Sequence, residues 1–176
     1  KSNNIKIIDI DPKFKDPFNV PLQKSSKFVI NSLNLAHNLG LKQNVSGIIN
    51  CAINKNLLGK SKFGVTEYLA SKCKIKNNSE VMQIQNKDFS VCLLTTHVDV
   101  KDISKKIKKN LIISKVKTIN NWYKKYLNKK PKIGILGLNP HNAEYRKNSE
   151  ENKIIKPAIK KLVKMKIKVV GPLISD

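Results

Sequence analysis

The chain has 176 residues, of which 40% are hydrophobic and 6% aromatic, a composition that predicts a mostly folded globular protein. Its net charge of +23 raises nucleic acid or an anionic membrane as a possible partner. However, Arg146 is the only arginine among 35 basic residues and the lysines are spread along the whole chain, whereas base and phosphate recognition favours arginine, so we expect no nucleic-acid-binding function.

The first half of the chain alternates short apolar runs with helical patterns. Residues 5–10 and 45–51 are apolar runs of strand length, and each is predicted to form a strand. Between them, apolar residues recur at helical spacing over residues 24–39, and Gly40 is a natural helix stop. Thr66 is placed to cap a short helix that follows it.

The second half predicts four more strands and a long helix. Residues 81–84 and 89–95 are two strands a hairpin's distance apart, and residues 132–138 and 167–170 are two further strands. Residues 111–127 form an amphipathic helical pattern. The buried stripe of this helix is predicted to contain Ile112, Val116, Ile119, Tyr123 and Leu127.

Another helix is predicted after the 132–138 strand. Ser149, followed by Glu150 and Glu151, signals its start, and Pro157 should kink or restart it. Strands that alternate with helices in this way predict an α/β fold with a layered sheet rather than an all-β or α+β fold.

Two of the predicted strands are followed within a few residues by a histidine. His141 follows the 132–138 strand after an Asn-Pro turn, and His97 follows the 89–95 strand after a second hydroxyl residue. In open α/β sheets, ligands bind at the carboxyl ends of strands, and imidazole is a common metal ligand. The two histidines could therefore share one metal ion. A catalytic ion needs about three protein ligands, however, and a structural role is the commoner one for a histidine after a strand.

Other residues bear on substrate and location. Lys55, after the predicted 45–51 strand, could hold an anionic substrate or be one more exposed lysine.

The three cysteines are odd in number and widely separated, so they predict no disulfide framework. With no signal peptide and no apolar run of membrane-spanning length, a cytoplasmic location without a membrane partner is expected. The chain lacks an initiating methionine and ends soon after an apolar strand, which suggests an excerpt of a longer protein.

Four motifs occur together in a specific order, although each motif alone would be a weak signal. They are Gly-x-Thr-Glu-Tyr-Leu at 64–69, Leu-Thr-Thr-His at 94–97 with Lys101-Asp102, Gly-Leu-Asn-Pro-His at 137–141 with Glu144, and Val-Val-Gly-Pro-Leu at 169–173 with Asp176. By this combination the chain, from about residue 24 to its end, resembles the 4-hydroxythreonine-4-phosphate dehydrogenase (PdxA) family.

The resemblance implies an enzyme of pyridoxal 5′-phosphate (vitamin B6) biosynthesis. It implies a three-layer α/β/α fold, like that of isocitrate and isopropylmalate dehydrogenases, of which residues 1–176 would form the central portion. Such an enzyme uses NAD or NADP to oxidise 4-phosphooxy-L-threonine, after which the product loses carbon dioxide. The motif match makes His97 and His141 ligands of a divalent metal (Zn, Mg or Co) that acts as a Lewis acid, with a third histidine supplied by the other subunit of a homodimer. It also makes Thr66 a contact of the phosphorylated substrate.

The chain departs from the family pattern at three places. Val65 stands where the family has a histidine that touches the substrate, Asn50-Cys51-Ala52 replaces a Thr-Gly/Ala-Pro stretch before the lysine, and residues 142–147 replace a glycine-rich loop. Two alternatives to the leading function therefore stay open. One is the same chemistry on another phosphorylated hydroxy acid, which Val65 favours, and the other is a basic binding protein on an inactive enzyme scaffold.

Overall fold

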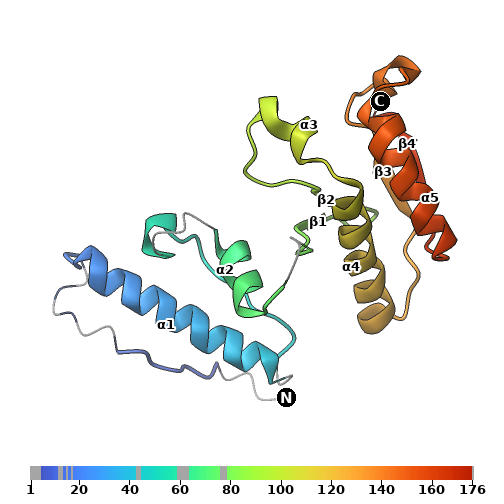
Figure 1. Cartoon of the computed structure of the whole chain (residues 1–176). Coiled ribbons are helices and arrows are strands. Elements are labelled where there is room, and N and C mark those ends of the chain that lie inside the picture. Colours follow the sequence, from blue (N-terminus) through green and yellow to red (C-terminus); the bar gives the residue numbers. More distant parts are fainter. Residues whose placement is uncertain are drawn as a thin grey trace. The chain divides into compact units, whose positions relative to one another are not determined.

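The chain forms two compact units, Lys1–Lys74 and Ile75–Asp176, which we call the N-terminal and C-terminal units (Figure 1). The structure is a computed structural model that describes residues 5–11, 14, 16, 18–42, 45–58, 64–75 and 79–175.

The N-terminal unit consists of a long helix, a 3₁₀ turn and a short helix. These elements are α1 (Leu22–Leu41), η1 (Lys55–Leu58) and α2 (Val65–Lys72). The Ser26 hydroxyl of α1 donates a hydrogen bond to the Leu57 carbonyl of η1 over 2.6 Å. The Tyr68 hydroxyl of α2 donates one to the side-chain oxygen of Asn34 on α1 over 2.9 Å. The long helix is therefore tied to both shorter elements.

The two strands predicted for this unit are not formed. Residues 5–10 and 45–51 have no strand pairing within the described part of the chain, and Ile49 is fully exposed. An apolar run becomes a strand only when a neighbouring strand satisfies its backbone groups. Among the described residues of this unit, Leu33 and Leu58 are the buried hydrophobic ones, so the core they form is small.

Both helices of this unit have boundaries that differ from the prediction. Gly40 does not end α1, which continues to Leu41. At Gly40 the missing side chain leaves room for Ile48, whose Cδ1 lies 3.3 Å from where a Cβ would stand. α2 begins at Val65, so Thr66 is its second residue rather than its cap.

The C-terminal unit contains two separate pairs of strands. β1 (Gln83–Gln85) and β2 (Ser90–Cys92) form the predicted antiparallel hairpin, whereas β3 (Ile133–Leu136) and β4 (Val169–Leu173) are parallel. The helical elements are η2 (Val100–Asp102), α3 (Ile103–Lys106), α4 (Lys109–Leu127), η3 (Asn142–Tyr145), the π-helical turn η4 (Glu151–Ile155) and α5 (Lys156–Lys164). Because η4 and α5 connect the parallel strands β3 and β4, these elements form a βαβ unit, and the predicted α/β class is confirmed.

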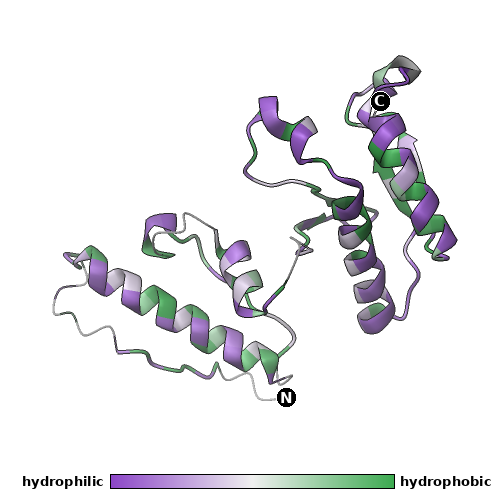
Figure 2. Cartoon of the chain, in the orientation of Figure 1, coloured by the Kyte–Doolittle hydropathy of each residue, from purple (hydrophilic) through white to green (hydrophobic). Residues whose placement is uncertain are grey.

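The core of this unit lies where α4 and α5 pack against each other and α5 packs on β4 (Figure 1). Figure 2 shows α5 with hydrophobic and hydrophilic residues interleaved, as expected for a helix with one buried face. The buried cluster consists of Ile107, Ile112, Ile113, Val116, Ile155, Ala158, Ile159, Leu162, Ile167 and Val169. Of the predicted stripe of α4, Ile112 and Val116 are buried, but Leu127 is 44% exposed, so the stripe ends before the helix does.

Two glycines allow β3 and β4 to lie close together. A Cβ on Gly134 would stand 2.8 Å from the Leu173 Cδ1 atom. Gly171 has a φ of +139°, and a Cβ there would collide with the carbonyl oxygen of Ile135. Larger residues at these positions would push the two strands apart.

Several predicted elements are shorter or more exposed than expected. β2 ends at Cys92, and β3 alternates between half-buried and exposed residues instead of being buried throughout. The helix restart predicted at Pro157 is confirmed, because the π-helical turn precedes α5 and Pro157 lies in the first turn of α5. None of the helices in the described residues is both long and apolar enough to span a lipid bilayer.

Candidate metal and substrate site

The loop that follows β3 carries His141 and is held by a buried carboxylate. The Oε1 atom of Glu151 accepts hydrogen bonds from the backbone N–H groups of Leu138 (2.9 Å) and Asn139 (3.0 Å). The side-chain oxygen of Asn139 in turn accepts a hydrogen bond from the backbone N–H of His141 (2.9 Å). The His141 side chain is exposed, so its position is set through its backbone.

Glu151 is almost completely buried, with 2% of its surface exposed. Burial alone would raise the pKa of this carboxyl, but the hydrogen bonds that it accepts, that from the Asn139 N–H foremost, bring the pKa below its usual value. The side chain is therefore a carboxylate at neutral pH, and its hydrogen bonds to the loop are charge-assisted.

The same loop is also attached to β4. Gly137 donates its backbone N–H to the Leu173 carbonyl over 2.9 Å, and the Asn142 side-chain amide donates to the Pro172 carbonyl over 3.2 Å. A Cβ on Gly137 would collide with the Asn142 side chain, so this glycine is needed for close approach.

Two residues of this loop have left-handed backbones. Asn142 and Ala143 have φ values of 51° and 52°, although neither is glycine. Asparagine tolerates this region better than most residues, whereas alanine has no side-chain hydrogen bond to offset the cost. Ala143 is buried, with 4% of its surface exposed.

His97 lies in the segment between β2 and η2. Its side chain is exposed, and its backbone is left-handed, with a φ of 55°. Among residues other than glycine, histidine is one of those enriched in this conformation, and such outliers are concentrated at functional sites.

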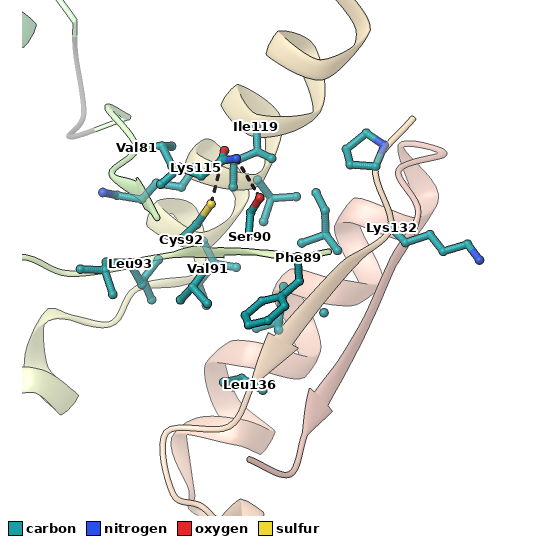
Figure 3. Close-up of a pocket in the computed structure, with 18 of the residues that line it drawn as sticks. Val81, Phe89, Ser90, Val91, Cys92, Leu93, Lys115, Ile119, Lys132 and Leu136 are labelled. Carbon is teal, nitrogen blue, oxygen red and sulfur yellow. Dashed lines mark hydrogen bonds between the residues drawn. The ribbon is translucent and has the colours of Figure 1, made fainter. Parts of the chain in front are cut away.

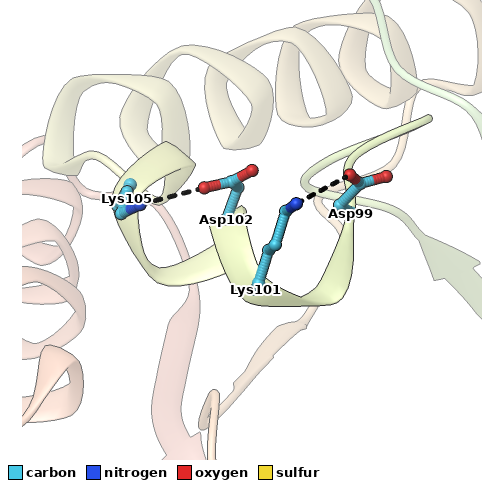
Figure 4. Close-up of polar contacts among 4 residues, drawn as sticks. All are labelled: Asp99, Lys101, Asp102 and Lys105. Carbon is cyan, nitrogen blue, oxygen red and sulfur yellow. Dashed lines mark hydrogen bonds and ion pairs between the residues drawn. The ribbon is translucent and has the colours of Figure 1, made fainter.

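The Lys101-Asp102 pair of the His97 motif makes surface contacts. Figure 4 shows Lys101 Nζ facing Asp99 (3.9 Å) and Lys105 Nζ bonded to Asp102 (3.0 Å). The two lysine side chains are more than 70% exposed, so these ion pairs add little stability.

A cavity of about 930 Å³ adjoins the start of both histidine loops. Its walls come from β1, β2, α4 and β3, and Figure 3 shows Phe89, Val91 and Leu136 among the lining residues. Thr95 and Leu138, which precede His97 and His141, also line it, whereas neither histidine does. The two strands that lead to the histidines therefore border one cavity.

Four polar side chains that line this cavity form hydrogen bonds with one another. Gln83 donates hydrogen bonds to the hydroxyl oxygens of Ser90 and Tyr123, each over 3.1 Å, and its side-chain oxygen accepts a weak one from the Cys92 thiol (3.9 Å; Figure 3). Burial raises the pKa of the Cys92 thiol, opposed in part by the charge of Lys115. The thiol is therefore protonated at neutral pH, a form in which cysteine is a poor nucleophile.

The predicted substrate residues belong to the N-terminal unit. Lys55 begins η1 and is exposed, and Val65 and Thr66 are the first two residues of α2, with Val65 half-buried and Thr66 exposed. The structure thus brings Val65 and Thr66 together on one helical turn. The metal candidates His97 and His141 belong to the C-terminal unit. Within the described residues there is no group of three or more His, Cys, Asp or Glu side chains placed to hold a metal, and the prediction that the two imidazoles share an ion stays a prediction.

Sequence reasoning missed Glu151 and the role of Asn139. The sequence pattern predicts Glu151 as a helix-start charge, whereas its side chain accepts hydrogen bonds from the loop. The signal for Asn139 was the Asn-Pro-His sequence. An asparagine side chain commonly accepts the backbone N–H of the residue two positions later, in an Asx-turn, and here that residue is His141.

Comparison with known proteins gives the family. The family model described as "Pyridoxal phosphate biosynthetic protein PdxA" matches residues 1–176. A 4-hydroxythreonine-4-phosphate dehydrogenase of Aquifex aeolicus is 34% identical over 100% of this chain and 55% of its own length, and one of Sulfurihydrogenibium is 39% identical over 77% of this chain and 43% of its own. The chain thus spans about half the length of the curated relatives it matches.

The fold comparison agrees with this result. The crystal structure of a 4-hydroxythreonine-4-phosphate dehydrogenase from Klebsiella pneumoniae has a TM-score of 0.80, with 23% identity over 92% of this chain and 50% of that chain. At this identity the likeness concerns the fold. The match of the family model over all 176 residues shows that the chain belongs to the PdxA family of pyridoxal phosphate biosynthetic proteins.

Proposed function

We propose that the full-length protein oxidises 4-phosphooxy-L-threonine with NAD or NADP and releases carbon dioxide, as a step of pyridoxal 5′-phosphate biosynthesis in the cytoplasm. The observation that carries this proposal is the family match over the whole chain, together with curated relatives that are named 4-hydroxythreonine-4-phosphate dehydrogenase. We also propose that the full-length protein has the three-layer α/β/α fold, of which the βαβ unit around β3 and β4 is a part.

His97 and His141 are the proposed metal ligands, and their chemistry fits a divalent ion. Both imidazoles are exposed. Nitrogen ligands suit zinc and cobalt better than magnesium, which prefers oxygen. A divalent ion bound there would supply Lewis-acid polarisation of a substrate oxygen. Because three protein ligands are usual, a third histidine from the other subunit of a homodimer is part of the proposal.

Thr66 and Lys55 are the proposed substrate contacts. The exposed hydroxyl of Thr66 on the first turn of α2 can donate a hydrogen bond to an anionic substrate. The exposed ammonium of Lys55 can pair with a phosphate or carboxylate as a point charge.

The direct test is hydride transfer by the full-length protein. With 4-phosphooxy-L-threonine, NAD or NADP and a divalent metal, we expect nicotinamide reduction, followed at 340 nm, with release of one carbon dioxide for each hydride. Removal of the metal by a chelator should abolish the reaction, and added zinc or cobalt should restore it. Absence of nicotinamide reduction with either cofactor and each of the three metals would contradict the proposal.

A second candidate is the same chemistry on another phosphorylated hydroxy acid. The observation that favours it is Val65, a half-buried aliphatic residue on the same helical turn as Thr66, where the family's histidine could donate a hydrogen bond. A panel of phosphorylated hydroxy acids in the same assay would separate the two candidates by their kcat/KM values.

A further inference from the structure

We infer that Glu151 is a positioning residue that holds the loop after β3 so that His141 can present its imidazole to a metal ion. This inference rests on the metal-binding role of His141 under the proposed function. Glu151 itself binds neither metal nor substrate in this assignment.

The geometry consists of two hydrogen-bonded steps in series. One carboxylate oxygen of Glu151 accepts the consecutive backbone N–H groups of Leu138 and Asn139. Asn139 then accepts the N–H of His141 with its side-chain oxygen. A rotation of the Asn139 peptide would break the hydrogen bond from Asn139 to Glu151 and the one from His141 to Asn139. By holding this peptide, the Glu151 carboxylate sets the direction in which the His141 backbone leaves the turn.

The anchor at the other end of this series is buried. Glu151 begins η4, and Ile155 of the same turn is 3% exposed within the core cluster of the C-terminal unit. The loop that it holds includes the left-handed residues Asn142 and Ala143, a conformation that persists only when its surroundings fix it. The backbone N–H groups that precede the exposed His141 are thus connected to the packed core through the Glu151 carboxylate.

Comparison with the neighbouring residue Glu150 shows that an acidic side chain at the start of a helix does not need to contact the histidine loop. Glu150 is also at the start of η4, and it is half-buried rather than buried. Either residue could serve the favourable interaction between acidic side chains and a helix N-terminus. Only Glu151, of these two, accepts hydrogen bonds from the histidine loop in the described structure.

The test measures binding of Co²⁺ to the metal-free full-length protein by its visible absorption spectrum, at a temperature where circular dichroism shows every variant folded. Outer residues that orient a metal-binding histidine typically change metal affinity about 10- to 100-fold when replaced. We expect a loss of this size, with altered Co²⁺ band positions, for Glu151→Ala. Glu151→Gln, which keeps an acceptor oxygen, should lose less. The matched control Glu150→Ala should stay within about twofold of the natural protein, since it removes a charge without touching the loop.

A second pair of variants tests the next step of the series and keeps the inference testable if Glu151→Ala does not fold. Asn139→Ala removes the acceptor of the His141 N–H and should weaken Co²⁺ binding, whereas Asn139→Asp keeps an acceptor oxygen and should restore most of it. Hydrogen exchange of the His141 amide in the metal-free protein should accelerate in Glu151→Ala and Asn139→Ala.

The outcomes separate this inference from the proposed function. If Glu151→Ala matches Glu150→Ala in both Co²⁺ affinity and His141 amide exchange, Glu151 is not a positioning residue. If the natural protein binds no Co²⁺, the metal role of His97 and His141 fails, and with it the role of Glu151 toward a metal. Amide exchange then still decides whether Glu151 holds the loop.

Discussion

Three residues of the two histidine loops, His97, Asn142 and Ala143, have left-handed backbones without being glycine. Such a conformation costs roughly 1–2 kcal/mol for a residue with a Cβ. In the loop after β3, the hydrogen bonds of Glu151 and Asn142 and the burial of Ala143 offset this cost. Strain that the surroundings maintain at two loops of one unit is typical of binding sites.

The stability that Glu151 contributes should depend on pH. Its pKa is lower in the folded protein than its usual value, so the ionised form stabilises the fold. This contribution is complete above the usual glutamate pKa of about 4.3 and is lost as the pH falls through the lowered folded value. The difference in unfolding free energy between the natural protein and Glu151→Gln should therefore be larger at about pH 7 than at about pH 3 in urea denaturation. Glu150→Gln controls for the removal of one negative charge, and an equal difference at both pH values would contradict the expectation.

Val65 should limit the use of 4-phosphooxy-L-threonine. It lies at the first position of α2 beside Thr66, and a hydrogen bond to a charged substrate group is worth roughly 1.5–3 kcal/mol, about one to two decades of affinity. Val65→His should raise kcat/KM for this substrate by about 10- to 100-fold without changing the number of metal ions bound. Val65→Leu, which adds volume but no donor, should not. A decrease in Val65→His, with faster turnover of another phosphorylated hydroxy acid by the natural protein, would favour the second candidate function.

Among the elements, α5 ends in a Schellman motif with a lysine in the position that favours glycine. The Lys166 N–H donates to the Val163 carbonyl (2.8 Å) and the Ile167 N–H to the Leu162 carbonyl (3.2 Å), while Lys166 has a φ of 59°. Leu162 and Ile167 are both buried, which is the hydrophobic contact usual for this motif.

Lys166→Gly should therefore stabilise the protein by about 0.5–1 kcal/mol, because removal of the left-handed strain exceeds the added chain entropy of the unfolded state. The matched control is Lys161→Gly, an exposed position inside α5, which should destabilise by about 1 kcal/mol. Urea unfolding at neutral pH measures both changes. Destabilisation by Lys166→Gly would mean that the lysine stem makes packing contacts that outweigh the strain.

Helices could be predicted from this sequence better than strands. α1 and α4 were found from the spacing of apolar residues, which is a property of the helix itself. The apolar runs at residues 5–10 and 45–51 have strand character but no strand partner in the described part of the chain. A strand depends on a second segment, and a run of residues alone does not specify whether that segment exists.

The candidate site could be predicted in part. The motifs pointed to His97 and His141, and the structure has both of them exposed in loops after β2 and β3. The interaction of Glu151 with the Asn139 backbone could not be predicted, because backbone N–H groups carry no sequence signal and the two residues are 12 apart. Hydrogen bonds between a side chain and a distant backbone are visible only once the chain is folded.

For the whole molecule, the charge of +23 should make stability depend on salt. A large net charge destabilises a compact state by self-repulsion, and added salt screens exposed charges. The urea midpoint should therefore rise between about 0.05 and about 0.5 M sodium chloride, as the Debye length falls below 10 Å. A midpoint that falls over this range would mean that ion pairs such as that of Lys105 with Asp102 outweigh the repulsion.

The two units should differ in local stability because they bury unequal amounts of apolar surface. The described part of the N-terminal unit buries the hydrophobic residues Leu33 and Leu58, whereas the C-terminal unit buries a ten-residue cluster that includes Leu162 and Ala158 at 0% exposure. Free energies of local opening rise with the apolar surface that a segment buries, since opening the segment exposes that surface to water. In native-state hydrogen exchange, with rates corrected for intrinsic exchange, the central amides of α4 and α5 should be protected more strongly than those of α1, although α1 is the longest helix in the described structure. Equal protection of α1 and α5 would mean that stability here follows helix length instead of the buried core.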